Sequence, residues 1–173
     1  MKLKKIIPLI FIAFAVGFTL QIIIQQNETI ETKIERKIKI QDSTLQKLIH
    51  YEIKNNIIYA FYTNTVYNTS SGLGLSVIEN NKGMSTHIIG AIELDSKKGL
   101  TYEISESKQL NLNVVYGSIN NSEIKTIQIN GHDCNIVNAT DLTFWYYISE
   151  NPMQSTLIEA KDQTGKVIIN ETF

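Results

Sequence analysis

The chain of 173 residues contains a single cysteine, Cys134, and its formal net charge is only −1. One thiol permits no internal disulfide, so the fold must rest on a buried apolar core. The near-neutral charge gives no support for a nucleic-acid partner, because recognition of the phosphate backbone needs a basic surface. These two shortages argue against a disulfide scaffold and against a nucleic-acid-binding function.

The usual ligand spacings of metal and phosphate sites are also missing. His50, His87, His132 and Cys134 form no C-x-x-C or H-x-x-x-H arrangement that would bring zinc ligands together. The glycines of Ser70–Gly74 are followed by no Gly-Lys-Ser/Thr sequence, which a phosphate loop requires. We therefore predict no cofactor and no metal.

The densest polar cluster is Gly131-His132-Asp133-Cys134. A cysteine nucleophile needs a histidine within hydrogen-bond reach, at about 3 Å. On a strand His132 and Cys134 share one face and Asp133 points away, so the three cannot converge locally. We predict that Cys134 is a small buried thiol and that the chain is not an enzyme.

A long uncharged run, by contrast, is present. Ile6–Ile24 is 19 residues long, which at about 1.5 Å per residue gives a helix of about 28 Å, close to the hydrocarbon thickness of a bilayer. The basic start Met1–Lys5 precedes it. Residues 1–26 are therefore predicted to be a basic start and a single membrane anchor, with the N-terminus cytoplasmic and the C-terminal body extracellular.

A cleaved signal peptide is the alternative to a retained anchor. Ala13-Phe14-Ala15 matches a small-residue cleavage site. Cleavage there would leave a short apolar core and a mature chain beginning with the apolar residues Val16–Ile24. A lipoprotein is excluded, because no cysteine follows the apolar run.

Residues 27–43 are interpreted as a stalk or linker. Ile30, Ile34 and Ile38 recur at helical spacing among charged residues, which predicts a narrow apolar stripe on a helix. The stripe is short, so a solvated stalk is favoured over a coil that pairs with another copy of the chain.

Residues 44–107 are predicted to form a short helix and a β-meander. Asp42-Ser43 provides an N-cap, and the apolar spacing that follows favours a helix over Thr44–His50. Continuous apolar character over Ile57–Tyr62 is typical of a strand covered on both faces. The turn Asn80–Gly83 then joins two further strands.

Residues 108–173 show regular strand alternation with turn residues between the strands, which predicts a β-sandwich. Asn130-Gly131 is a strong hairpin turn. The stretch Leu142–Ile148 carries large side chains on both faces and should be an interior strand, with Phe144 in the core.

This C-terminal part resembles small bacterial immunoglobulin-like β-domains. The resemblance is carried by Val115–Gly117, by Ile124–Gly131 and by the closing hairpin Ile158–Ile168. The whole chain is also similar to small membrane-anchored proteins of Gram-positive bacteria. The resemblance implies adhesion, spacing or protein contact, and it implies no catalytic residues.

Two function classes follow. The first is a non-catalytic interaction module at the cell envelope that contacts another envelope protein or the cell wall. Its candidate contact residues are Trp145 and Tyr147, which lie opposite Phe144 and either pack under a second layer or remain available for binding. The alternative is a ligand-binding or hydrolase-like domain whose site is assembled from distant residues such as His87, Glu93 and His132.

Overall fold

The computed structural model describes residues 28–66, 70–81, 83–107, 110–149, 151–153 and 155–173. The chain divides into two compact units, residues 1–34 and residues 35–173. The predicted anchor, Ile6–Ile24, lies outside the described residues. Within the described ranges, no helix combines the length and the apolar character that crossing a membrane would need.

The described residues form one helix and twelve strands, which confirms the mainly β class. Their bounds are α2 (Ile30–Gln41), β1 (Leu45–Lys54), β2 (Ile57–Val66), β3 (Ser70–Glu79), β4 (Thr86–Glu93), β5 (Glu103–Ser107), β6 (Leu112–Ser118), β7 (Thr126–Ile129), β8 (His132–Asp133), β9 (Asn135–Asn138), β10 (Thr143–Ser149), β11 (Leu157–Lys161) and β12 (Val167–Thr172).

Helix α2 is the helix that the isoleucine spacing predicted. Its stripe is not solvated as the stalk interpretation expected, because Ile34 and Ile38 are fully buried. Residues 35–41 belong to the larger unit. There the Lys37 ammonium donates a hydrogen bond to the Gly83 carbonyl at 2.7 Å, and the Glu35 carboxylate accepts one from the Leu48 N–H at 3.2 Å.

The helix predicted over Thr44–His50 is wrong, because Leu45–His50 lies in strand β1, which pairs antiparallel with β2. Two irregularities interrupt the register of β1, between Leu45 and Lys47 and between Leu48 and His50. Each interruption breaks the two-residue alternation of a strand, so the apolar residues fall at a spacing that imitates a helix.

Asp42 does not cap a helix N-terminus but closes the turn that leads from α2 into β1. Its carboxylate accepts hydrogen bonds from the Thr44 backbone N–H at 2.9 Å, the Tyr62 hydroxyl at 2.9 Å and the Asn64 amide at 3.1 Å. Burial alone would raise the pKa of Asp42, but these hydrogen bonds outweigh it and hold the pKa below its usual value. The turn therefore ties the end of α2 to β2.

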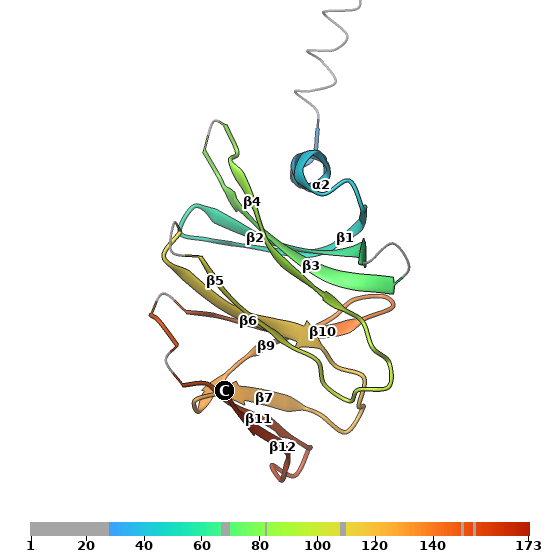
Figure 1. Cartoon of the computed structure of the whole chain (residues 1–173), viewed down its shortest axis with the longest axis vertical. Helices are drawn as coiled ribbons and strands as arrows, with labels where there is room; N and C mark the ends of the chain where they lie inside the picture. Colours follow the sequence, from blue (N-terminus) through green and yellow to red (C-terminus); the bar gives the residue numbers. More distant parts are fainter. Residues whose placement is uncertain (1–27, 67–69, 82, 108–109, 150, 154) are drawn as a thin grey trace, which may run out of the picture. The chain divides into compact units, whose positions relative to one another are not determined.

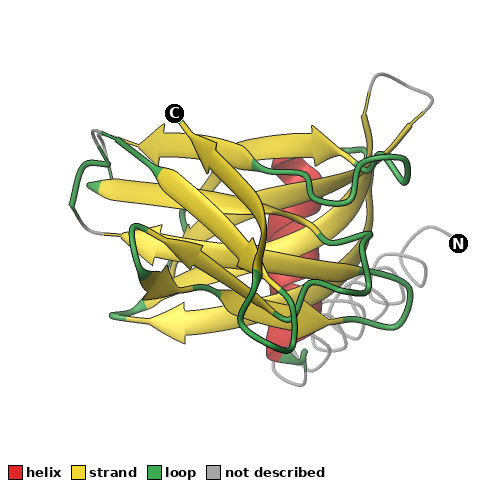
Figure 2. Ribbon diagram, turned by 90° about the horizontal axis from the view of Figure 1, so that it is seen from below, coloured by secondary structure: helices red, strands yellow, loops and turns green. Residues whose placement is uncertain are grey.

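Three antiparallel sheets of four strands each make up the larger unit (Figure 1). Sheet A has the order β1-β2-β3-β4, sheet C the order β5-β6-β10-β9 and sheet D the order β12-β11-β7-β8. Figure 2 shows that the strands of these sheets overlie one another when the unit is seen from below. Positive φ values at Asn55 and Asn56 close the β1–β2 hairpin, and those at Asn130 and Gly131 close the β7–β8 hairpin that the sequence predicted.

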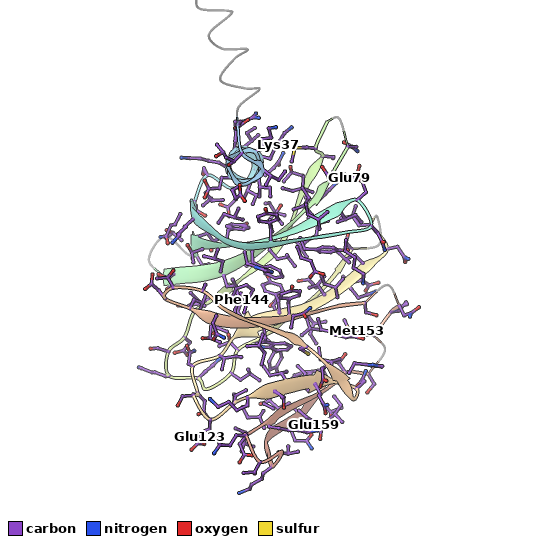
Figure 3. The ribbon with its side chains drawn as sticks, turned by 180° about the vertical axis from the view of Figure 1, so that it is seen from behind. Lys37, Glu79, Glu123, Phe144, Met153 and Glu159 are labelled. Carbon is purple, nitrogen blue, oxygen red and sulfur yellow. The ribbon has the colours of Figure 1, made fainter. Side chains whose placement is uncertain are left out.

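Sheet C is the middle layer, and successive side chains of its central strands enter two different cores. The first core, between sheets A and C, receives Phe144 and Tyr146 from β10. The second core, between sheets C and D, receives Trp145 from the same strand. Figure 3 shows the Phe144 side chain among those that fill the space between sheets A and C. The prediction that this strand is interior is confirmed, since β10 lies between β6 and β9.

The boundary proposed at residues 107/108 does not separate two sheets. Strand β5 lies before that boundary and pairs with β6, which lies after it. The first core also mixes residues from both sides, such as Phe61 and Phe144. Residues 44–107 and 108–173 therefore share one sheet and one core within the larger unit.

Candidate functional site

The two candidate contact residues have different environments. Trp145 is fully buried, and its indole N–H donates a hydrogen bond to the Thr101 carbonyl at 3.2 Å. Of the two alternatives weighed for Trp145, packing under a second layer is the one observed. Tyr147, two residues further along the same face, is only half-buried. Of the two candidate contact residues, only Tyr147 is therefore accessible to a partner.

Tyr147 lies in a groove where sheets C and D end together. Its ring stacks on the His132 imidazole of β8, with ring centroids 6.2 Å apart and an angle of 17° between the ring planes. The groove has a volume of about 380 Å³. The described residues that line it are Ile129, Asn130, His132, Tyr147, Ser149, Asn151, Pro152, Met153 and Ser155.

Asn130 fixes one wall of this groove. It has a φ of +50°, which asparagine tolerates better than most residues. Its side-chain amide donates to the Ser155 carbonyl at 3.0 Å, and its side-chain oxygen accepts from the Leu157 N–H at 2.8 Å. The hairpin turn that carries His132 is thereby tied to the segment that leads into β11, so the wall is preorganised.

The described lining of the groove mixes aromatic, apolar and polar side chains, and it includes no Asp, Glu, Lys or Arg. Pro152 and Met153 provide apolar surface, while Ser149, Asn151 and Ser155 provide hydroxyl and amide groups. The Ser149 hydroxyl donates to the Asn151 carbonyl at 3.0 Å, which orders this rim. Such a surface suits a neutral ligand with peptide-like or hydroxyl groups better than a strongly charged one.

Cys134 follows β8 directly but does not form a catalytic set with His132. Its side chain packs against the second core, whereas the His132 ring is stacked on Tyr147. Burial, assisted by the negative charge of Asp133, raises the pKa of the Cys134 thiol to about 12. A thiol with so high a pKa is almost entirely protonated near neutral pH, which makes it a poor nucleophile.

The three residues proposed for an assembled site are not brought together. Glu93 lines a separate cavity beside β12, and His132 lines the Tyr147 groove. His87 lines neither, and its ring nitrogen lies 3.4 Å from the Ser85 hydroxyl. Among the described residues, no group of three or more His, Cys, Asp or Glu side chains is placed to hold a metal ion.

A polar cluster that sequence analysis missed joins sheets A and C. The Tyr146 hydroxyl donates to the Glu52 carboxylate at 2.7 Å and lies 3.4 Å from the His50 imidazole. The imidazole is surrounded by the rings of Phe61, Phe144 and Tyr146, with centroids at about 6 Å.

The protonation states of this polar cluster follow from its burial. Burial lowers the pKa of His50, although the Glu52 carboxylate opposes the shift. Burial and the hydrogen bond to Glu52 raise the pKa of Tyr146 above its usual value. Both groups are therefore held neutral near pH 7, and the hydrogen bond from Tyr146 to Glu52 links the two sheets. The one local signal in the sequence was the pair His50 and Glu52, two positions apart on one strand face.

No protein-family model matches the sequence, and no curated protein or solved structure is significantly similar to it. The resemblance to immunoglobulin-like domains therefore rests on the strand and turn pattern of residues 108–173 alone.

Proposed function

We propose that this protein is a non-catalytic interaction module of the cell envelope, and that the Tyr147 groove binds a polypeptide segment of another envelope protein. The observation that carries the proposal is the stacked pair of Tyr147 and His132 in a preorganised groove. Aromatic side chains with a polar tip are enriched at protein interfaces, because they bury a large apolar area and still make hydrogen bonds.

The lining favours a neutral, extended partner. Backbone amides of a bound segment would meet hydroxyl and amide groups such as those of Ser155 and Asn151, while an apolar side chain would pack between Met153 and Tyr147. Groups of this kind adapt their hydrogen bonds to a partner at low entropic cost. The cell wall is the other candidate partner, and a glycan would use the same ring stack.

Location and architecture belong to the same proposal. The uncharged run Ile6–Ile24 behind a basic start supports a retained single-pass anchor with the body outside the cell. Sheets C and D, two antiparallel sheets with the second core between them, support an immunoglobulin-like sandwich for the C-terminal part. Domains of this architecture serve many functions, so the groove and not the fold carries the functional argument.

The test is site-specific photocrosslinking in intact cells that make the full-length chain. A photoreactive phenylalanine analogue at position 147 should yield a discrete protein adduct. The same analogue at Ile53, which is 50% exposed on β1, is the matched control and should yield none. Substituting Ser155→Asp should abolish the adduct without lowering the melting temperature, because Ser155 lines the groove and its side chain is exposed.

Equal crosslinking from positions 147 and 53 would overturn the assignment of the groove. An adduct to glycan in place of protein would replace the polypeptide partner by the cell wall. Protease added to intact cells after wall removal should digest a tag placed at Phe173, and a protected tag would reverse the proposed topology.

A further inference from the structure

Strand β12 leaves one edge of sheet D open. It is the terminal strand in the order β12-β11-β7-β8, so within the described residues it pairs only with β11. Phe173 and Thr156 exchange two backbone hydrogen bonds on the β11 side, at 3.0 and 3.2 Å. Antiparallel pairs alternate between bonded and non-bonded positions, so Asn170 and Thr172 direct their N–H and C=O groups away from β11.

The strand lacks the two residue types that most often protect an open edge. Its sequence, Val167-Ile-Ile-Asn-Glu-Thr172, contains no lysine and no proline, the residues that most often block unwanted pairing. Val167, Asn170 and Thr172 are exposed. The one irregularity of the β11–β12 pair lies at its far end, between Ala160 and Lys161. The outward backbone groups near the C-terminus are thus available to another strand.

A cavity of about 640 Å³ lies beside this edge. Strand β12 contributes Ile169 and Glu171 to it, on the strand face opposite to Asn170 and Thr172. The other wall comes from the end of β4 and from the connection between β4 and β5. Its residues there are Ile92, Glu93, Asp95, Lys98, Gly99, Leu100, Thr101 and Tyr102.

The cavity combines an apolar wall with acidic side chains. Glu93, Asp95 and Glu171 come from three different segments, and Lys98 is the one basic residue in the described lining. Tyr102 holds the acidic wall in place, because its hydroxyl donates to the Glu171 carboxylate at 2.6 Å. A lysine or arginine side chain fits such a site, because its aliphatic stem packs on apolar surface while its charged head reaches the carboxylates.

We propose that the β12 edge binds an extended basic segment of a partner protein by strand addition. Backbone hydrogen bonds to Asn170 and Thr172 would supply affinity, and every second side chain of the added strand would enter the acidic cavity and supply specificity. This surface is distinct from the Tyr147 groove, which includes β8 at the opposite edge of sheet D. It therefore goes beyond the proposed function and stands or falls separately from it.

The test uses the full-length chain in a neutral detergent and a fluorescent peptide of alternating lysine and valine. Binding is followed by fluorescence anisotropy. Asn170→Pro removes an outward N–H without touching the ladder to β11, whereas Asn170→Ala keeps that N–H and is the matched control. We expect Asn170→Pro to weaken peptide binding about tenfold and Asn170→Ala to change it less than about twofold.

Two further arms separate strand addition from simple charge attraction. A peptide of the same sequence with alternate backbone N-methyl groups keeps its charge but cannot add as a strand, and it should bind at least about tenfold more weakly. Glu93→Gln should weaken binding of the unmodified peptide and reduce its salt dependence. Absence of binding by the lysine–valine peptide, or equal binding by its N-methylated form, would overturn the proposal even if Asn170→Pro failed to fold.

Discussion

The two cores of the larger unit are built on opposite faces of the same sheet, yet they differ in kind. The first core, between sheets A and C, is rich in rings and includes Tyr59, Phe61, Tyr116, Phe144 and Tyr146. The second core, between sheets C and D, is mostly aliphatic, and Trp145 is its single fully buried ring. Successive side chains of strand β10 point alternately into the two cores, so neighbouring residues of the chain contact different sheets.

The difference lies in how each core treats polar groups. In the first core, one ring hydroxyl carries a hydrogen bond between sheets, from Tyr146 to Glu52. In the second core, the Trp145 indole is satisfied by the Thr101 backbone, which crosses close over Gly117. The first core thus depends on side-chain chemistry, whereas the second depends on close approach of backbones.

The largest expected effect comes from truncating either ring of β10. Phe144→Ala and Trp145→Ala should each cost about 3–5 kcal/mol, a large part of the total of about 5–15 kcal/mol typical of a domain. Phe144→Ala should leave the full-length chain nearly unfolded. Urea unfolding followed by circular dichroism measures both, with Ile104→Ala, at a residue 40% exposed on the same sheet, as the control.

Because both cores share sheet C, each variant should still unfold in a single transition. Two separate transitions would show that the cores unfold independently, although they share sheet C. A Phe144→Ala variant as stable as the parent would contradict the assignment of its face.

A smaller effect is expected from Gly117→Ala, which tests the close approach in the second core. A Cβ at this position would lie 1.7 Å from the Thr101 carbonyl oxygen, so the backbone would have to move. Overpacking of this kind typically costs about 1–3 kcal/mol. Thermal unfolding measures the loss, and a shift in Trp145 fluorescence should accompany it, because the same carbonyl accepts the indole N–H. Gly83→Ala, whose Cβ would meet only an ordinary contact at 3.6 Å, should change neither.

The smallest effect is expected from His50, which tests the contribution of the polar cluster at the first core to stability. Its pKa is lowered in the folded chain from the usual 6.5, so the unfolded chain binds a proton first as the pH falls. The stability contributed by neutral His50 is therefore complete above about pH 6.5 and is lost as the pH falls below that value. The melting temperature should drop between pH 7.5 and pH 5, and His50→Gln should flatten this slope. An unchanged slope in the variant would assign the pH dependence to other groups. The lowered pKa of Asp42 affects stability only below about pH 5.

Much of the strand framework could be predicted because alternation and turn chemistry are local. Asn130-Gly131 and Leu142–Ile148 were interpreted correctly for that reason. Strand β1 could not be, because its two register irregularities depend on pairing with β2 and leave a pattern that imitates a helix. The burial of the α2 stripe also escaped prediction, since the burial of Ile38 is a tertiary property.

The candidate site was predictable only in part. Tyr147 was identified from strand alternation, but its stack with His132 requires β8 and β10 to meet across two sheets. The same alternation could not decide that Trp145 lies beneath a second layer, because a strand pattern does not show what covers each face. The contact between Tyr146 and Glu52 joins residues 94 positions apart, and no local pattern pairs these two residues.

The order in which the sheets can be completed during synthesis follows from their connectivity. Sheet A pairs each strand with the next along the chain, whereas the chain passes from sheet C to sheet D and back before either is complete. Sheet A can therefore form early from local contacts, but its ring-rich face stays uncovered until β6 and β10 have emerged. The nascent chain therefore exposes the apolar face of sheet A, a surface of the kind that chaperones bind, until the last third of the chain has been synthesised.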